Sequence, residues 1–126
     1  MTTPTQGIVL FAHGSRDPLW RAPIEAVEAH IRAHHPGVAV RCAYLELTTP
    51  DLPQAVEDLV DQGATAVTIV PMFLGTGKHA REDLPVLVAE LRARHPRVQV
   101  HVQAAIGEDP RMTELMAHIA CTPPTQ

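Results

Sequence analysis

The sequence has 126 residues, of which 45% are hydrophobic and 19% charged, and its formal net charge is −4. This length suits one compact domain, predicted over residues 1–121, and the composition is typical of a folded protein. The negative charge offers no general attraction to nucleic acid or to an anionic membrane. No apolar run could cross a bilayer, no apolar signal segment precedes residue 7, and the two cysteines form no CxxC pair. A soluble cytoplasmic protein is expected, with a flexible Pro-rich tail over residues 122–126.

Four segments along the chain have the character of β-strands. Residues 7–12 and 66–73 are short, continuous apolar runs, as in strands that are covered on both faces, and residues 38–45 form a weaker run. Residues 98–103 alternate between valine and polar side chains, which predicts a half-exposed strand at the edge of a sheet. No repeat is detected between these segments at the level of single residues.

The first two strands are each followed by a helical pattern. Residues 24–31 place apolar side chains on one helix face, and Pro36-Gly37 ends this first helix. Asp51 with Gln54 resembles a capping box, in which two side chains satisfy the free N–H groups of a helix start. The second helix is therefore expected to begin at this pair and to end at Gly63.

Two more helices are predicted in the second half of the chain. Pro85 belongs in the first turn of a helix, where its missing N–H has no cost, so the third helix is expected to start near Asp83. Asp109 is expected to cap a final helix. The apolar positions of this final helix are Met112, Leu115, Met116 and Ile119.

Strict alternation of strand and helix predicts an α/β fold with a parallel sheet and helices on both faces. With four strands the compact order is 2-1-3-4, like a truncated flavodoxin. Ligands of such sheets bind outside the carboxyl ends of the strands, at the switch point between strands 1 and 3. Functional side chains are therefore expected just after the strands.

Three side chains with suitable chemistry occupy these positions. His13 follows the first strand, Glu46 the second, and His79 lies in the loop that follows the third. Imidazole and carboxylate together suit a divalent first-row metal ion, and both groups accept protons near neutral pH. The sequence thus predicts that His13, His79 and Glu46 converge on one rim of the sheet.

The loops around this rim suit an anionic ligand. Gly14 lets the backbone turn sharply after the first strand, and Gly75 and Gly77 make the third loop adaptable. Side chains of Met72, Phe73 and Leu74 offer an apolar wall. Four cations surround the rim and are suited to a polycarboxylate: Arg16, Arg21, Lys78 and Arg81.

Taken in order, these motifs resemble the short-form sirohydrochlorin cobalto- and ferrochelatases, the class II chelatases of the cobalamin and sirohaem pathways. The resemblance rests on residues 13–17, on residues 44–47, on residues 70–85 with their glycines and His79, and on residues 105–111. It covers nearly the whole chain. It implies a flavodoxin-like chelatase half-domain and a lyase that inserts Co²⁺ or Fe²⁺ into a tetrapyrrole, with release of two protons and no organic cofactor.

The resemblance also implies roles for particular residues. His13 and His79 would bind the metal or take pyrrole protons, and Glu46 would act as a further ligand or base. A homodimer is implied, because longer relatives hold two such domains in one chain with the macrocycle between them. Nickel-dedicated relatives often carry a His-rich insertion in the second loop, whereas residues 75–82 contain only His79, which disfavours Ni²⁺. Arg16, Lys78 and Arg81 are expected to hold the carboxylates at the edge of the macrocycle.

Several alternatives stay open at this point. Glu46 could equally serve a helix start, and the three cations could equally be solvated surface charges. His30 and His34 stand four apart on one helix face, and without a third ligand they are interpreted as solvated. A histidine phosphatase would need an arginine directly before the first histidine, where this chain has Ala12. A non-catalytic metal or tetrapyrrole carrier on the same fold is the remaining rival.

Overall fold

The computed structural model describes residues 6–124 and contains one parallel sheet in the order β2-β1-β3-β4. Its strands are β1 (Gln6–Ala12), β2 (Ala39–Tyr44), β3 (Ala66–Pro71) and β4 (Gln99–Val102). The predicted order, the parallel direction and the edge position of the fourth strand are confirmed, with strand ends within two residues of expectation. The polar residues before Gln6 and the last two residues of the predicted tail lie outside the described residues.

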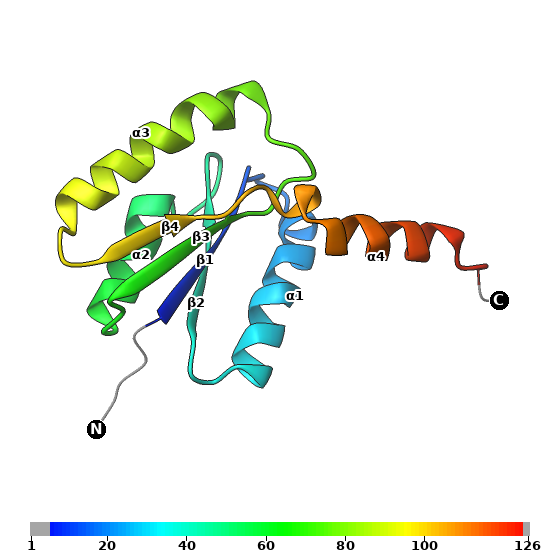
Figure 1. The fold of residues 1–126 in the computed structure, drawn as a ribbon, viewed down its shortest axis with the longest axis horizontal. Coiled ribbons are helices and arrows are strands. Elements are labelled where there is room, and N and C mark those ends of the chain that lie inside the picture. Colours follow the sequence, from blue (N-terminus) through cyan, green and yellow to red (C-terminus); the bar gives the residue numbers. More distant parts are fainter. Residues whose placement is uncertain (1–5, 125–126) are drawn as a thin grey trace.

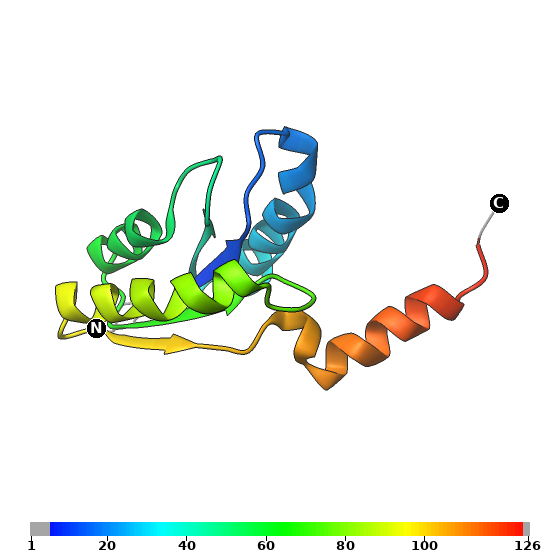
Figure 2. The ribbon, with the colours of Figure 1, turned by 90° about the horizontal axis from the view of Figure 1, so that it is seen from above.

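The helices cover the two faces of the sheet unequally (Figures 1 and 2). Helix α1 (Pro18–His34) packs on one face, through Ile24 and Ile31, against the side of β1 and β2 that carries Leu10 and Val40. Helices α2 (Leu52–Asp61) and α3 (Lys78–Arg94) pack on the other face and enclose the larger core. A short 3-10 turn (Ile106–Glu108) leads into α4 (Pro110–Cys121), which projects away from the sheet. Helices on both faces are therefore confirmed for the first three only.

Two of the predicted helix caps form as expected. Asp51 accepts a hydrogen bond from the Gln54 N–H at 3.0 Å, and Asp109 accepts one from the Arg111 N–H at 2.8 Å. Only half of the expected capping box is present, because the Gln54 side chain donates to Asp58, one turn further along α2. One side-chain acceptor is thus enough to start each of these helices.

The predicted start of α3 near Asp83 is wrong, because α3 begins at Lys78 and Pro85 lies inside it. Ala80 and Leu84 are buried in the core ahead of the proline, so packing extends the helix toward its start. Burial of apolar surface on the first two turns outweighs the single backbone hydrogen bond that Pro85 removes. As a consequence, His79 lies in the first turn of a helix and not in a loop.

The interpretation that the chain has no repeat at the level of single residues is wrong, because one pattern occurs at both outer strands. The pattern Arg-Ala-x-His-Pro-x-Val-x-Val occurs at residues 32–40 and again 60 residues later, at residues 92–100. In both copies the arginine Nη2 donates to an outer-strand carbonyl, from Arg32 to Val40 at 3.1 Å and from Arg92 to Val100 at 2.7 Å. These bonds occupy backbone groups that would otherwise stay unpaired at the two edges of the sheet.

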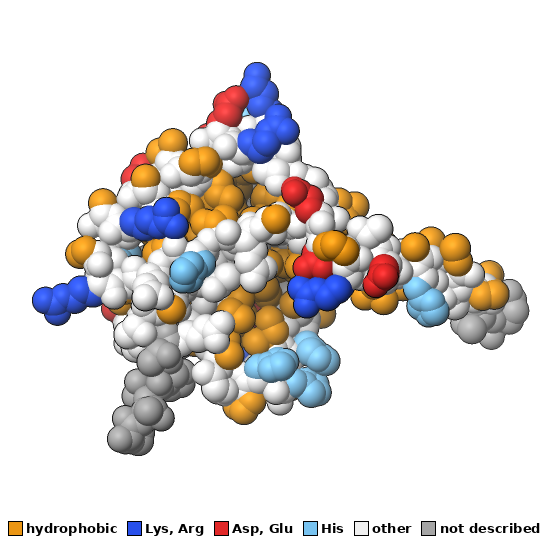
Figure 3. Space-filling view, viewed as in Figure 1, with side chains coloured by type: hydrophobic (Ala, Val, Ile, Leu, Met, Phe, Trp, Pro, Cys, Tyr) orange, Lys and Arg blue, Asp and Glu red, His pale blue; other side chains and the backbone are white. Residues whose placement is uncertain are grey.

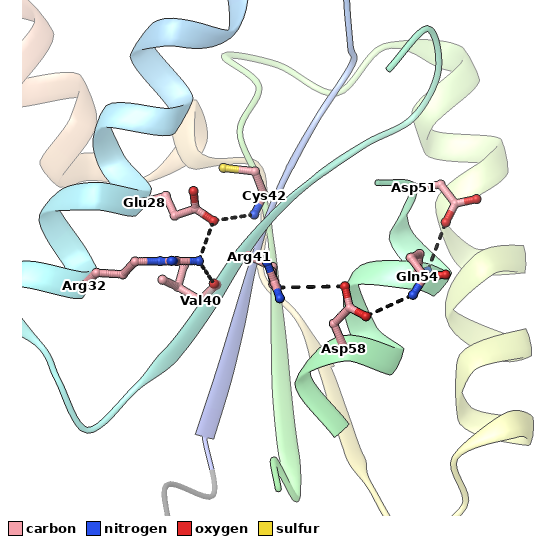
Figure 4. Close-up of polar contacts among 8 residues, drawn as sticks. All are labelled: Glu28, Arg32, Val40, Arg41, Cys42, Asp51, Gln54 and Asp58. Atoms are coloured by element: carbon pink, nitrogen blue, oxygen red, sulfur yellow. Dashed lines mark hydrogen bonds and ion pairs between the residues drawn. The ribbon is translucent and has the colours of Figure 1, made fainter. Parts of the chain in front are cut away.

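The edge formed by β2 is held by a further acidic side chain (Figure 4). Glu28 on α1 accepts a hydrogen bond from the Cys42 N–H at 3.2 Å and pairs with Arg32 at 3.3 Å. Burial, with the charge of Glu28 beside it, raises the pKa of the Cys42 thiol to about 12. Cys42 is thus a buried structural residue, as its strand position predicts. No helix in the described part of the chain is long and apolar enough to span a bilayer.

Candidate functional site

His13 directly follows β1 at the carboxyl end of the sheet, and its side chain is exposed. Its ring lies against the ring of Phe73, with centroids 4.4 Å apart and planes inclined by 31°. Phe73 is itself only 5% exposed and packs edge-on against Phe11 behind it. Within residues 6–124, neither ring nitrogen of His13 has a hydrogen-bond partner. The position of the imidazole therefore depends on Phe73, and both nitrogens are left for a ligand.

Glu46 is held beside His13 by its backbone. The Glu46 N–H donates to the His13 carbonyl at 3.0 Å, so the two segments run together past the ends of β1 and β2. Gly14 has a φ of +107°, and a Cβ at this position would collide with the Glu46 carbonyl oxygen. Asp51 already caps α2, so Glu46 does not serve the helix start. Its exposed carboxylate makes no ion pair with any described residue.

His79 occupies the second position of α3 and is exposed, on a different element from His13 and Glu46. The structure does not bring the three predicted ligands into one cluster. Among residues 6–124, no group of three His, Cys, Asp or Glu side chains lies close enough to hold a metal ion. Within one chain the rim offers His13 next to Glu46, with His79 at a neighbouring helix start.

The cations at the rim differ in whether they have partners. Arg21 pairs with Glu25 at 3.6 Å on the exposed side of α1. The predicted ligand contacts Arg16, Lys78 and Arg81 are exposed, and none pairs with a carboxylate of the described chain. Arg16 follows β1, whereas Lys78 and Arg81 lie in the first turn of α3, where Gly77 is the N-cap and supplies no side-chain acceptor to the helix N–H groups. This end of the rim therefore attracts anions through both free charges and free N–H groups.

A groove of about 590 Å³ extends from this region along α3, beside the outer strand β4. Its lining is mainly apolar, and Figure 3 shows hydrophobic side chains exposed between these two elements. The groove is lined by Thr76, Ala80, Arg81, Leu84, Pro85, Val88, Arg92 and Val102. Sequence reasoning missed this feature. The available signal was Val102, an apolar residue at the end of an edge strand, which is 39% exposed.

Burial also affects the one tyrosine near the rim. Tyr44, at the end of β2, is 2% exposed, and its ring centroid lies 6.5 Å from that of Trp20. Burial raises the pKa of its hydroxyl to about 12. Tyr44 therefore stays protonated at neutral pH.

A parallel sheet in the order 2-1-3-4 defines a flavodoxin-like α/β protein. Its candidate ligand site is the carboxyl end of the sheet, which carries imidazole, carboxylate and cations that pair with no described carboxylate. The CbiX family model matches residues 7–121, and the chain belongs to this family. The resemblance inferred from the sequence motifs is thereby confirmed, as is the fold class.

Three known proteins illustrate the relationship. A sirohydrochlorin ferrochelatase of Bacillus subtilis is 30% identical over 113 residues, which are 90% of this chain and 43% of that protein. A sirohydrochlorin cobaltochelatase of Methanococcoides burtonii is 33% identical over 82 residues, 65% of this chain and 63% of that protein. The crystal structure of a CbiX protein from Marinobacter aquaeolei VT8 superposes with a TM-score of 0.78 at 32% identity, covering 91% and 93% of the two chains. The chain thus spans less than two thirds of both curated relatives.

Proposed function

We propose that the chain is a sirohydrochlorin chelatase, a lyase that inserts Co²⁺ or Fe²⁺ into sirohydrochlorin in cobalamin or sirohaem biosynthesis. Membership of the CbiX family and the names of its chelatase relatives support this activity. The observation that carries the proposal is the exposed His13 imidazole, which lies against the Phe73 ring and has neither nitrogen paired within residues 6–124. Its backbone is bonded to that of Glu46, whose carboxylate makes no ion pair with any described residue. We place the enzyme in the cytoplasm, where its two free cysteines would stay reduced.

The reaction requires two events at one place. A free-base macrocycle must lose two N–H protons while a partly desolvated M²⁺ enters from one face. In this proposal His13 and His79 present the metal substrate and accept the pyrrole protons, and Glu46 orients the metal or relays a proton. Few protein ligands, with water at the remaining positions, hold the ion weakly enough for it to be handed over. Because neither nitrogen of His13 is hydrogen-bonded to a described residue, this side chain can exchange ligands without breaking a hydrogen bond within residues 6–124.

The macrocycle is bound by complementary charge and by apolar contact. Arg16, Lys78 and Arg81 lack carboxylate partners within the described chain, so the carboxylates of the substrate would be their partners. The groove along α3 joins this cationic area at Thr76 and Arg81 and offers an apolar surface to the ring. Gly75 and Gly77 make the loop that joins β3 to α3 flexible enough to adjust to the bound ring.

The protein would act as a homodimer, and α4 is the element that favours this state. In α2, side chains spaced i, i+3, i+4 and i+7 are buried against the sheet: Leu52, Ala55, Val56 and Leu59. In α4, the same spacing occurs 60 residues later at Met112, Leu115, Met116 and Ile119, and α4 has no buried residue. Leu115 is 49% exposed and Ile119 61%. We call these four apolar side chains the stripe of α4. A helix whose apolar stripe is left exposed is suited to packing on a second copy of the chain.

The sheet's own open face is a poor alternative for α4. On the side that carries α1, the outer strand β4 presents polar residues, Gln99, His101 and Gln103, which are all exposed. A second copy would also supply the half that the Bacillus subtilis relative has in its longer chain, of which this chain matches 43%. The scattered rim ligands of one chain could then be completed across the interface.

The dimer is tested by charging the stripe of α4. Leu115→Glu with Ile119→Glu should convert a dimer into a folded monomer in sedimentation equilibrium, because two buried charges oppose association. Thr113→Glu, which is on the same helix but outside the stripe, is the matched control and should stay dimeric. A wild-type chain that sediments as a monomer would reject the proposed assembly.

The activity is tested by time-resolved absorbance of free sirohydrochlorin mixed with Co²⁺, Fe²⁺ or Ni²⁺. A chelatase accelerates the spectral change above the spontaneous rate, whereas a carrier binds the ring and leaves the rate unchanged. We expect acceleration with Co²⁺ or Fe²⁺ and a smaller effect with Ni²⁺. Binding without acceleration for every metal would favour the carrier function.

A further inference from the structure

A second pair of imidazoles lies far from the rim, on the last two turns of α1. His30 and His34 are exposed and four residues apart, and α1 runs from the rim end of the sheet toward the start of β2. At 1.5 Å per residue the pair lies about 20 Å along the helix from its rim end. Figure 3 shows a group of histidine side chains at the surface near the lower end of α1. The pair therefore belongs to no part of the site described above.

The two rings are arranged next to each other in the structure. Their centroids are 4.1 Å apart and their planes are inclined by only 20°. The Nδ1 of His34 lies 3.0 Å from the His30 carbonyl oxygen, which can only accept, so Nδ1 carries the proton. This hydrogen bond occupies Nδ1 and leaves the Nε2 of His34 as the nitrogen available to a metal ion.

The surroundings of the pair also favour a cation. The last turn of α1 has the negative end of the helix dipole and carbonyl groups without helical partners. The neighbouring cation Arg32 is turned away, toward Glu28 and the Val40 carbonyl, by the contacts that protect the edge of the sheet (Figure 4). Its charge is neutralised by Glu28 at 3.3 Å. Both the imidazoles and the local field thus suit a positively charged ligand.

We propose that His30 and His34 form a surface site for a divalent first-row transition ion, separate from the rim, with water completing its coordination. Histidines at i and i+4 present their nitrogens to one point on a helix surface, which is how helical zinc sites are built. Exposed side chains change rotamer within nanoseconds, so the His30 ring can turn a nitrogen toward the Nε2 of His34 without a change in the backbone. The site prefers Cu²⁺ and Ni²⁺ to Fe²⁺ and Co²⁺, following the general order for nitrogen ligands.

The proposal does not depend on chelatase activity and is tested with Ni²⁺ alone. Backbone amide NMR of the intact chain should show paramagnetic broadening at residues 30–35 on addition of Ni²⁺. His34→Gln should weaken binding at this position by at least about tenfold, because a two-point attachment becomes a single one. Metal insertion by this variant should match the wild type, since neither histidine belongs to the rim.

A control variant tests whether Ni²⁺ binding depends on the spacing of the two histidines or only on their number. His34→Gln combined with Ala29→His keeps the number of histidines but places two of them at adjacent positions, which do not face each other on a helix. This double variant should bind Ni²⁺ as weakly as His34→Gln alone. The proposal is rejected if the wild type shows no broadening at residues 30–35, or if His34→Gln or the double variant shows the same broadening as the wild type at the same Ni²⁺ concentration.

Discussion

The outer strands and the rim use charged side chains in opposite ways. At the outer strands Arg32 and Arg92 donate to backbone carbonyls and Glu28 accepts from a strand N–H, so each charge has a protein partner. At the rim Arg16 and Lys78 are exposed and pair with no described carboxylate. A charge bonded to an edge strand stabilises the fold, whereas an unpaired charge adds nothing to it and is available to a ligand. Whether a charge has a partner in the described chain therefore distinguishes the residues that stabilise the fold from those proposed to bind the ligand.

The strongest test of this contrast is His79→Ala. If His79 presents the metal and accepts protons as proposed, its loss should lower the insertion rate by about a hundredfold to ten-thousandfold. The urea midpoint should stay unchanged, because the side chain is exposed and has no hydrogen bond or ion pair within the described part of the chain. His101→Ala removes another exposed histidine, on β4, and should change neither quantity. Full insertion activity in His79→Ala would remove His79 from the proposed site.

Phe73→Leu tests whether the Phe73 ring holds the His13 imidazole in place. Without the aromatic ring the His13 imidazole, which has no hydrogen bond within residues 6–124, loses its fixed plane. We expect kcat to fall about tenfold with little change in KM for sirohydrochlorin, because orientation and not substrate binding is impaired. Phe11→Leu is the control, since it loosens the same aromatic pair without touching His13. Equal losses of kcat in both variants would mean that general packing, and not the stack, is responsible.

The fold was predictable because its main signals are local. Each buried strand is a short apolar run, and residues such as Asp51 and Asp109 cap helices through contacts two or three positions away. The error at Pro85 arose where local preference and packing disagree, since buried Ala80 and Leu84 extend α3 past the expected start. The exposure of α4 could also not be predicted from local sequence. Its stripe matches a buried helix, and only the three-dimensional arrangement shows that nothing in the described chain covers it.

The sequence predicted where the candidate site residues lie in the fold, but not which side chains they contact. The positions of His13 and Glu46 follow from strand ends, because parallel strands end at one edge of the sheet. The stack of His13 on Phe73 joins residues 60 positions apart, and no spacing rule reveals it. The groove beside β4 is likewise a product of packing between distant segments. His79 lies apart from His13 and Glu46 in the described chain, because packing of Ala80 and Leu84 extends α3 and places His79 in its first turn.

A smaller effect is expected from Arg32→Met, which removes one edge contact and leaves the rim intact. Loss of the bond to the Val40 carbonyl should lower the free energy of unfolding by about 1 kcal/mol, the usual net value of such a bond. The insertion rate should not change. Arg94→Met lies on the equivalent part of α3, has no ion pair or hydrogen bond through its side chain in the described chain, and should be neutral in urea denaturation. A fall in activity without a fall in stability would place Arg32 with the functional charges instead.

The smallest effect concerns a charge pair that belongs to neither region. Arg111 donates through Nε and Nη2 to Asp109, and with the backbone N–H of Arg111 these bonds lower the Asp109 pKa to about 2. Because the folded pKa lies below the ordinary value of 3.8, the stabilising contribution is present above that value and is lost as the pH falls toward 2. Carbon-13 NMR titration should give this low pKa, and Arg111→Ala should raise it only partway, since the backbone N–H at position 111 remains. The pair is exposed to solvent, so Arg111→Ala should leave the urea midpoint at neutral pH nearly unchanged. A clear drop in that midpoint would show that an exposed ion pair by itself stabilises this protein. The stability of the outer strands could then come from ion pairing, as between Arg32 and Glu28, and not from the hydrogen bonds of these side chains to backbone groups.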